Sequence, residues 1–248
     1  MSTTIDFALN VHAPFASPSA LLPVGAHPVS LPGGTVLWLL PQRAVWWPAE
    51  RTAFVADVHF GKAATFRRAG QPVPHGTTAD NLARLDGVLA ATGAEHLVFL
   101  GDFLHARSGA DAPLWNQLLP WRERHGSVHL TLVRGNHDRH AGDPPPGLRI
   151  ALAEEPWTPR PGSELRACHH PQTVDGATAL AGHLHPTVTL RGRARDAVRL
   201  PCFAWLPGPP GLLVLPALGA FTGTAPQAML QAAQRFAVAD SRVIPLPP

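Results

Sequence analysis

TTADNLARLDGVLAATGAEHLVFLGD, residues 77–102, contains the alternation that decides the fold. Its leucines recur at helical spacing and Gly93 is a typical helix end, so we expect a helix over residues 77–92. The apolar run HLVFL has the length of a buried strand and ends at Gly101 and Asp102. A helix that leads directly into a buried strand is typical of the crossover connections in an α/β sheet.

The same alternation extends on both sides of this stretch. Upstream, the runs TVLWLL, AVWW and TAFVAD begin at Thr35 and end at Asp57, and their β-branched and aromatic content predicts three strands. Downstream, a helical stretch over residues 112–124 leads into VHLTLVRGNHD. The second half of the chain has short predicted strands with few helices between them, at residues 164–169, 177–182, 187–190, 197–203 and 212–214. We therefore expect an α/β (α+β) fold in which a second, more antiparallel sheet packs on the first, giving a two-sheet β-sandwich flanked by helices.

Composition sets broad limits on the class of protein. A chain of 248 residues with 45% hydrophobic residues can form one large core, and we expect a single domain over residues 34–248. Residues 1–33 are rich in Pro, Ser and Ala and predict an irregular lead-in with room for one early strand. No apolar run approaches the ~18 residues of a membrane span, and the N-terminus lacks a secretory pattern, so we expect no membrane association and a cytoplasmic location. Cys168 and Cys202 match no zinc or redox spacing and are expected to stay reduced and buried.

Five short polar segments carry the chemistry, and each lies where a predicted strand gives way to a turn. They combine carboxylate, imidazole and amide donors, which suit ions such as Mn²⁺, Fe²⁺ or Zn²⁺, whereas a thiolate-rich set would indicate structural zinc. A catalytic metal site therefore fits them better than a structural one. The segments are Asp57-Val58-His59, Gly101-Asp102, Gly135-Asn136-His137-Asp138, Cys168-His169-His170 and Gly182-His183-Leu184-His185.

The local pattern of these segments favours one shared site. Glycine precedes Asp102, Asn136 and His183, which lets the backbone turn sharply and approach the site closely. In the segments DVH and HLH the two polar side chains are two positions apart, and they would point to the same face if the strand continued. Each segment is common when taken singly, but the ordered set of five is not expected by chance.

The ordered set resembles the calcineurin-like metallophosphoesterase superfamily, whose pattern DxH, GD, GNH(D/E), H, GHxH is matched over about residues 55–186. The strings DVHFGKAATFRRAG, LGDFLHAR, RGNHDR, CHHP, GHLHP and LPCFAWLPG, from about Phe54 to Thr224, look like the bacterial DNA-ligase-associated branch of phosphodiesterases and endonucleases. The resemblance implies a four-layer αββα fold and two divalent metal ions. Mn²⁺ is the first expectation, with Fe²⁺ or Zn²⁺ as alternatives.

The resemblance also implies how the side chains divide between the two metal ions. The Asp102 carboxylate would bridge the pair. In CHHP either His169 or His170 can be the ligand, and we choose His169 because similar families place the ligand two residues before the proline. The implied first set is Asp57, His59 and His185, and the implied second set is Asn136, His169 and His183.

The implied general acid is His137, with Asp138 as its orienting partner. The expected chemistry follows from charge, because two cations neutralise the negative oxygens of a phosphodiester and lower the pKa of a bridging water until hydroxide is available for in-line attack. The leaving alkoxide then needs a proton, which a histidine with a pKa near the working pH can supply.

The substrate is less well determined than the site. The formal net charge of +3 is compatible with a polyanion but not diagnostic of one, because GC-rich coding also produces an arginine-rich chain. The family resemblance favours DNA, single-stranded or structured, together with a role in DNA repair and a functional association with DNA ligase or helicase proteins. An enzyme for cyclic nucleotides, dinucleotides or monoesters and a non-catalytic scaffold are the alternatives. Cations and a histidine that follow the motifs are candidates for substrate contact: Lys62, His105, Arg107 and Arg139.

Overall fold

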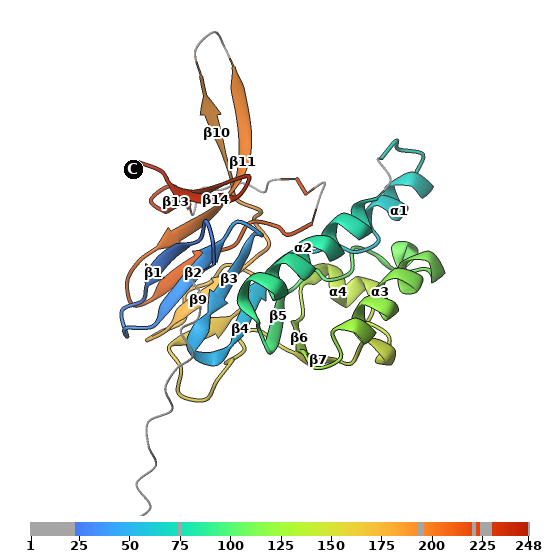
Figure 1. Ribbon diagram of the computed structural model, residues 1–248, viewed down its shortest axis with the longest axis horizontal. Coiled ribbons are helices and arrows are strands. Elements are labelled where there is room, and N and C mark those ends of the chain that lie inside the picture. Colours follow the sequence, from blue (N-terminus) through green and yellow to red (C-terminus); the bar gives the residue numbers. More distant parts are fainter. Residues whose placement is uncertain (1–22, 74–75, 193–195, 220–221, 224–229, 248) are drawn as a thin grey trace, which may run out of the picture.

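Two seven-stranded sheets form the body of the protein, and the helices lie to one side of them (Figure 1). The computed structural model describes residues 23–73, 76–192, 196–219, 222–223 and 230–247. Most of the predicted lead-in, residues 1–22, therefore lies outside the described residues.

The first sheet has its strands in the order of the sequence. The first four strands pair antiparallel, whereas the fourth to the seventh pair parallel. Antiparallel neighbours need only tight turns, but parallel neighbours need crossover connections, and the helices supply these. The strands are β1 (His27–Ser30), β2 (Val36–Leu40), β3 (Ala44–Trp47), β4 (Thr52–Val55), β5 (His96–Leu100), β6 (His129–Val133) and β7 (Ile150–Ala153).

The helices cover the outer face of the first sheet. Leu85 and Val88 of the second helix are fully buried in a cluster shared with that sheet. The third helix is capped by Asp111, whose carboxylate accepts a hydrogen bond from the amide of Leu114 at 3.1 Å. The described α-helices are α1 (Lys62–Arg68), α2 (Thr77–Thr92), α3 (Ala112–Arg124) and α4 (Asn136–Ala141), and the short 3-10 helices are η1 (Pro48–Glu50), η2 (Arg107–Gly109) and η3 (Pro146–Leu148).

The second sheet packs on the inner face of the first. Phe54 and Leu100 of the first sheet share one buried cluster with Phe203 and Phe236 of the second, which is the core of a β-sandwich. The neighbours β8, β9 and β12 are parallel and the other pairs are antiparallel. The strands are β8 (Leu165–Ala167), β9 (Thr178–Ala181), β10 (Thr187–Arg191), β11 (Ala197–Leu206), β12 (Gly211–Val214), β13 (Gln234–Ala239) and β14 (Arg242–Pro245).

This architecture confirms the predicted α/β class with two sheets flanked by helices. The two helices expected over residues 77–92 and 112–124 have those bounds, and both cysteines are buried and unpaired. The early strand allowed for in the lead-in is β1, which pairs with β2, so the folded sheet extends back to His27. The sequence did not predict β7, β13, β14 or α4, because their apolar runs are short and lack a clear period.

Candidate metal centre

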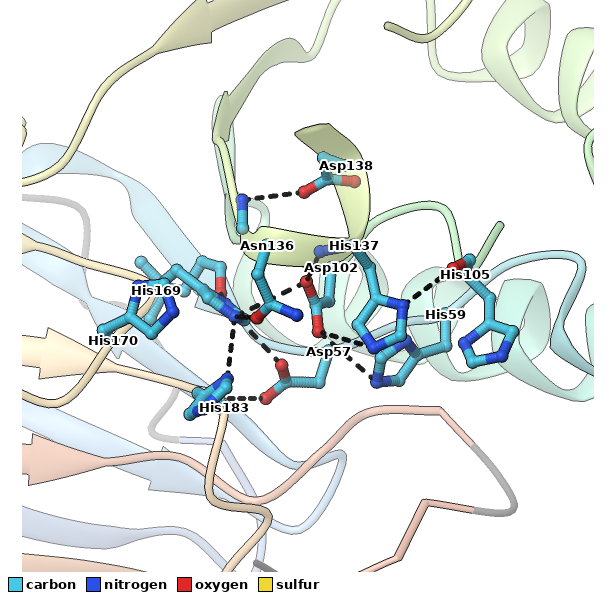
Figure 2. Close-up of polar contacts among 12 residues, drawn as sticks. Asp57, His59, Asp102, His105, Asn136, His137, Asp138, His169, His170 and His183 are labelled. Atoms are coloured by element: carbon cyan, nitrogen blue, oxygen red, sulfur yellow. Dashed lines mark hydrogen bonds and ion pairs between the residues drawn. The ribbon is translucent and has the colours of Figure 1, made fainter. Parts of the chain in front are cut away.

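The predicted ligands follow the carboxyl ends of neighbouring strands in both sheets. Asp57, Asp102 and Asn136 come after β4, β5 and β6, which are adjacent and parallel. On the second sheet, His169 and His183 come after the parallel neighbours β8 and β9. Because the carboxyl ends of parallel neighbours meet at one edge, the sandwich gathers these side chains into one cluster (Figure 2).

The backbone at the cluster has an unusual conformation. Asp57, His59, Asp102, His183 and His185 have φ values of 54°, 50°, 50°, 69° and 48°, in the left-handed region that non-glycine residues rarely adopt. The strands do not continue into these motifs, since β4 and β9 both end before them, so strand alternation does not account for the direction of their side chains. Each such residue costs on the order of 1–2 kcal/mol, so the surrounding fold must hold these residues in place.

Glycines in the motifs allow the strand ends to approach each other, as the sequence predicted. A Cβ atom on Gly101 would overlap the imidazole of His169, and Gly101 itself has a φ of 77°. A Cβ atom on Gly182 would lie 2.6 Å from Asp57 Oδ2. These positions exclude larger side chains because the neighbouring donors occupy the space.

One half of the cluster contains the DVH and HLH motifs. Donor atoms of Asp57, His59 and His185 all lie within 4.8 Å of one another. His185 Nε2 is 3.5 Å from Asp57 Oδ1 and also 3.5 Å from His59 Nε2. His59 Nε2 is 3.8 Å from Asp102 Oδ2. Such a set of mutually facing donors has the spacing expected around a single cation.

The other half of the cluster is built around His169. Its Nε2 atom is 2.9 Å from Asn136 Oδ1, 3.1 Å from His183 Nδ1 and 3.4 Å from Asp102 Oδ1. Asp102 thus directs one carboxylate oxygen toward each half (Figure 2). The structure therefore brings all seven predicted ligands together in two adjoining groups that share one carboxylate.

The donor set fits a metal centre better than a purely hydrogen-bonded cluster. Asp57 Oδ1 is buried and has no hydrogen-bond partner, which is costly for a carboxylate unless a cation faces it. His169 Nδ1 donates to the Leu100 carbonyl and His185 Nδ1 donates to the Gly223 carbonyl, at 3.1 and 2.7 Å. In a neutral ring the remaining Nε2 then carries a lone pair, so both imidazoles present acceptors to the cluster.

Burial shifts the pKa values in the direction that a metal centre needs. Desolvation lowers the pKa of His169 to about 4 and also lowers the pKa values of His59 and His183. These imidazoles are therefore neutral ligands near pH 7. Burial first, and then the nearby charge of Asp57, raises the pKa of Asp102 to about 8. Without a cation Asp102 is therefore mostly protonated near pH 7, and a divalent cation beside it would favour the ionised carboxylate.

His169 faces the cluster, whereas His170 is held at its border. The His169 side chain is fully buried, but the His170 side chain is 44% exposed. His170 Nδ1 forms an ion pair with Glu155 Oε1 at 2.6 Å, and Glu155 Oε2 accepts from the amides of both histidines. The geometry therefore favours His169 as the ligand of this motif. No motif in the sequence pointed to Glu155, which lies 14 residues before His169.

His137 extends to the cluster from the first turn of α4. Its Nε2 atom is 3.9 Å from Asp102 Oδ2 and its Nδ1 atom donates to the backbone carbonyl of His105 at 2.8 Å. The ring of His105 stacks on the ring of His137, with centroids 4.8 Å apart. The carbonyl and the stacked ring together fix the direction of Nε2.

Asp138 does not orient His137, so this part of the expectation is wrong. The Asp138 carboxylate accepts a hydrogen bond from the amide of Gly135 at 2.9 Å (Figure 2). It also accepts one from the amide of Leu104 at 3.1 Å. It is buried and turned away from the imidazole because it satisfies amides at the N-terminus of α4 and in the loop after β5. Asp138 therefore positions the backbone that carries Asp102 and His137.

The proposed substrate contacts separate into two groups. Lys62 lies close enough that Asp102 raises its pKa, although burial has the larger and opposite effect, and the net shift is downward. Arg107 is exposed on η2. Arg139, by contrast, forms an ion pair with Glu154 at 2.6 Å. The structure thus places Lys62 and His105 at the border of the cluster, leaves Arg107 exposed on η2, and pairs Arg139 with Glu154.

A buried asparagine that the sequence did not reveal supports the first motif. Asn81 on α2 donates from its Nδ2 atom to the carbonyl of Val58 at 3.0 Å, in the middle of the DVH segment. Its side chain is buried. Asn81 lies 23 positions after Val58 in the sequence, and no motif links the two residues. The contact depends on how α2 packs.

Comparisons with known proteins show the family of this chain and support its fold. Residues 50–186, more than half of the chain, match the family of calcineurin-like phosphoesterases. A solved structure, the nuclease MPE of Pseudomonas putida, is 41% identical, with a TM-score of 0.74 over 89% of this chain and 100% of that chain. Another, the E. coli phosphoesterase Yfce, is 18% identical over 78% of this chain and 96% of that chain, with a TM-score of 0.38. No curated protein matches.

The fold and the donor cluster define a metal-dependent phosphoesterase, an enzyme that hydrolyses phosphate esters. The chain belongs to the calcineurin-like phosphoesterase family, in which activity depends on a binuclear metal centre. Among the residues that the structure describes, no helix is long and apolar enough to cross a bilayer.

Proposed function

We propose that the protein is a phosphodiesterase that cleaves nucleic acid, in particular single-stranded or structured DNA. The observation that carries the proposal is the pair of donor groups joined by Asp102, because two cations at adjoining positions can clamp a phosphodiester and stabilise its attacking and leaving oxygens. The 41% identity to a Pseudomonas putida nuclease supports nucleic acid as the substrate class.

The proposed ligands are divided between two metal ions in the same way as the donor cluster is divided into two halves. The Asp102 carboxylate would belong to both sets of ligands, because its Oδ2 atom lies near His59 and its Oδ1 atom lies near His169. We propose Asp57, His59 and His185 for one ion, and Asn136, His169 and His183 for the other. Mn²⁺ is our first choice, with Fe²⁺ or Zn²⁺ as alternatives, because mixed carboxylate, imidazole and amide donors suit these ions.

The cations, when bound, supply positive charge against the phosphodiester and lower the pKa of a water molecule that can act as nucleophile. The chain itself supplies the proton for the leaving group. When the His137 ring is protonated, the His105 carbonyl binds Nδ1–H, so Nε2–H points into the cluster and can pass its proton to the departing oxygen. The His137 side chain is 36% exposed, which allows solvent to restore that proton.

The border of the cluster would contact the rest of the substrate. Lys62 and Arg107 are proposed to bind phosphate oxygens, and His105 has a buried Nδ1 without a hydrogen-bond partner beside His137. Arg139 is a weaker candidate because binding phosphate would break its ion pair with Glu154. A role in DNA repair, a cytoplasmic location and an association with ligase or helicase proteins remain proposals that follow from the family resemblance.

An activity screen tests this function. The purified protein would be stripped of metal and supplied with Mn²⁺, Fe²⁺, Zn²⁺ or Mg²⁺. Each form would then be assayed on a single-stranded oligonucleotide, a small chromogenic diester and a monoester. We expect metal-dependent cleavage of the oligonucleotide with a higher kcat/KM than for either small substrate. Efficient hydrolysis of small esters without cleavage of DNA would instead support the small-molecule alternative.

A further inference from the structure

A two-stranded ribbon, formed by β10 and the first half of β11, projects from the body of the protein (Figure 1). Within the described residues, β10 pairs with β11 alone, in a register from Thr187↔Pro201 to Arg191↔Ala197. We call residues 187–192 and 196–201 the ribbon. It begins two residues after His185, so its base adjoins the proposed metal centre.

The stretch of sequence that contains the ribbon carries the excess charge of the chain. Residues 187–201, TVTLRGRARDAVRLP, contain four arginines and one aspartate, a formal net charge of +3. That value equals the formal net charge of the whole protein, so the remaining residues sum to zero. Arg193 and Arg195 lie outside the described residues and contribute only to this sum of charges. A local excess of this kind attracts polyanions far more specifically than a uniformly basic surface would.

The two faces of the ribbon differ in chemistry. Residues directly opposite each other share a face, so Thr189 lies beside Arg199, and Arg191 lies on the same side. The other face carries Leu190 and Val198, whose residues are 38% and 51% exposed. These side chains do not bury themselves in the core, so the ribbon adds little to the stability of the fold. A strand pair that leaves its apolar side chains in water calls for an explanation other than stability.

We propose that the ribbon binds the phosphate backbone of the nucleic-acid strand on one side of the cleavage point. This inference rests on the proposed nuclease function and adds the element that holds the polymer. Arg191 and Arg199 supply the charge, and the hydroxyl of Thr189 can donate to phosphate or sugar oxygens. A second copy of this chain is a poorer occupant, because two stretches of sequence that each have a net charge of +3 would repel each other.

The length of the ribbon predicts a length dependence of the substrate. Arg191 is six residues beyond His185, which corresponds to at most ~20 Å along an extended chain. At ~3.4 Å per stacked nucleotide, this span corresponds to about six nucleotides. Oligonucleotides shorter than this should not reach Arg191. Arg199 pairs with Thr189, only four residues after His185, so a strand of about four nucleotides can gain at most the contact with Arg199.

The test compares a ribbon variant with a control that removes the same charge elsewhere. The ribbon variant is Arg191→Gln with Arg199→Gln. The control is Arg51→Gln with Arg160→Gln, two exposed arginines near the start of β4, at the strand end opposite to Asp57. For each protein, KM and kcat are measured on a 20-nucleotide and a 4-nucleotide single strand and on a small diester, at several salt concentrations.

We expect the ribbon variant to raise KM for the 20-nucleotide strand roughly tenfold at low salt, with kcat unchanged. The slope of log KM against log salt should fall by about 1.4, which is ~0.7 for each lost phosphate contact on a single strand. The 4-nucleotide strand should be affected less than the 20-nucleotide strand, because it can contact Arg199 but not Arg191. The small diester should be unaffected, and an unchanged diester rate also shows that the variant is folded. The control should match the wild type.

The outcomes separate this inference from the function on which it rests. If the wild type hydrolyses the small diester but cleaves no oligonucleotide, the nuclease function fails and the inference with it. If the wild type cleaves the 20-nucleotide strand and the ribbon variant keeps the wild-type KM and salt slope, the inference alone is overturned. A ribbon variant that changes the oligomeric mass in light scattering while keeping its DNA affinity would assign the ribbon to self-association, which also overturns it.

Discussion

The donor cluster and the ribbon lie next to each other in the chain but follow opposite physical rules. In the cluster, Asp57 and His169 are fully buried, and the backbone is held in left-handed conformations that only a rigid surrounding can maintain. In the ribbon, Arg191 and Val198 are exposed and little of the core supports them. The contrast teaches that metal affinity comes from fixed geometry, whereas affinity for a polymer comes from exposed charge. Substitutions in the cluster should therefore reduce activity strongly, by the same factor at low and high salt. Substitutions at the surface should reduce activity less, and their effect should depend on the salt concentration.

The largest expected effect comes from removing a buried donor. Asp57→Ala should lower the metal content and reduce kcat/KM on any diester by about 10³-fold or more, since it removes several kcal/mol of electrostatic stabilisation. Elemental analysis after dialysis measures the metal content. Two equivalents of metal per chain in this variant would contradict the assigned role of Asp57. The loss should be the same at low and high salt, because the carboxylate is buried.

The next effect isolates proton transfer from metal binding. His137→Ala should keep its metal but lose ~10²–10⁴ in kcat on diesters with poor leaving groups, since the proton donor is absent. Diesters with good leaving groups need little protonation and should be cleaved at close to the wild-type rate. The ratio of the two rates is the measurement. An unchanged rate on the poor leaving group would refute the role of His137 as acid.

A third prediction concerns stability rather than rate. Because the pKa of Asp102 is raised to about 8 from an ordinary 3.8, its contribution to stability is present at low pH and is lost as the pH rises through about 8. The metal-free Asp102→Asn variant lacks this loss. It should be more stable than the metal-free wild type at pH 9 by about 1–2 kcal/mol, or ~2–8 °C in Tm, and similar to it at pH 5.

The histidines do not alter that comparison. Burial lowers the pKa values of His59 and His169, so their contribution is lost as the pH falls below the ordinary value near 6.5, equally in both proteins. With metal added the order should reverse, because the variant loses a ligand. Thermal melts with chelator and with Mn²⁺ make the measurement. A metal-free variant that melts below the wild type at pH 9 would contradict the account of Asp102.

The smallest effect on activity is expected for residues that belong neither to the donor cluster nor to the ribbon. Arg139→Ala should change kcat/KM less than about twofold, because its guanidinium is paired with Glu154 at an exposed position and such pairs contribute ~0–1 kcal/mol. Arg107→Ala is the matched comparison, with an expected rise of a few-fold in KM for oligonucleotides and a dependence on salt. An Arg139 effect larger than the Arg107 effect would reverse the assignment of these two residues.

The sequence predicted much of the fold because local pattern and global structure agree over its central part. The helix over residues 77–92 and the strand after it are both periodic and well delimited, and they form with the expected bounds. The strands β13 and β14 carried no comparable signal, since they are stabilised by pairing with each other and with β11 rather than by their own composition.

The site, like the fold, was predicted from the sequence only in part. The sequence by itself determined which donors are available and that they occur at strand ends, because the motifs and their order are local properties of the chain. Only the tertiary structure decided that Asp102 joins two groups and that His169 rather than His170 faces inward. It also decided that the Asp138 carboxylate binds backbone amides and not the ring of His137. These facts depend on how the two sheets meet and on which buried amides need acceptors, and no local pattern encodes either. The ribbon completes the contrast, because its arginines are visible in the sequence but its projection from the body follows only from pairing.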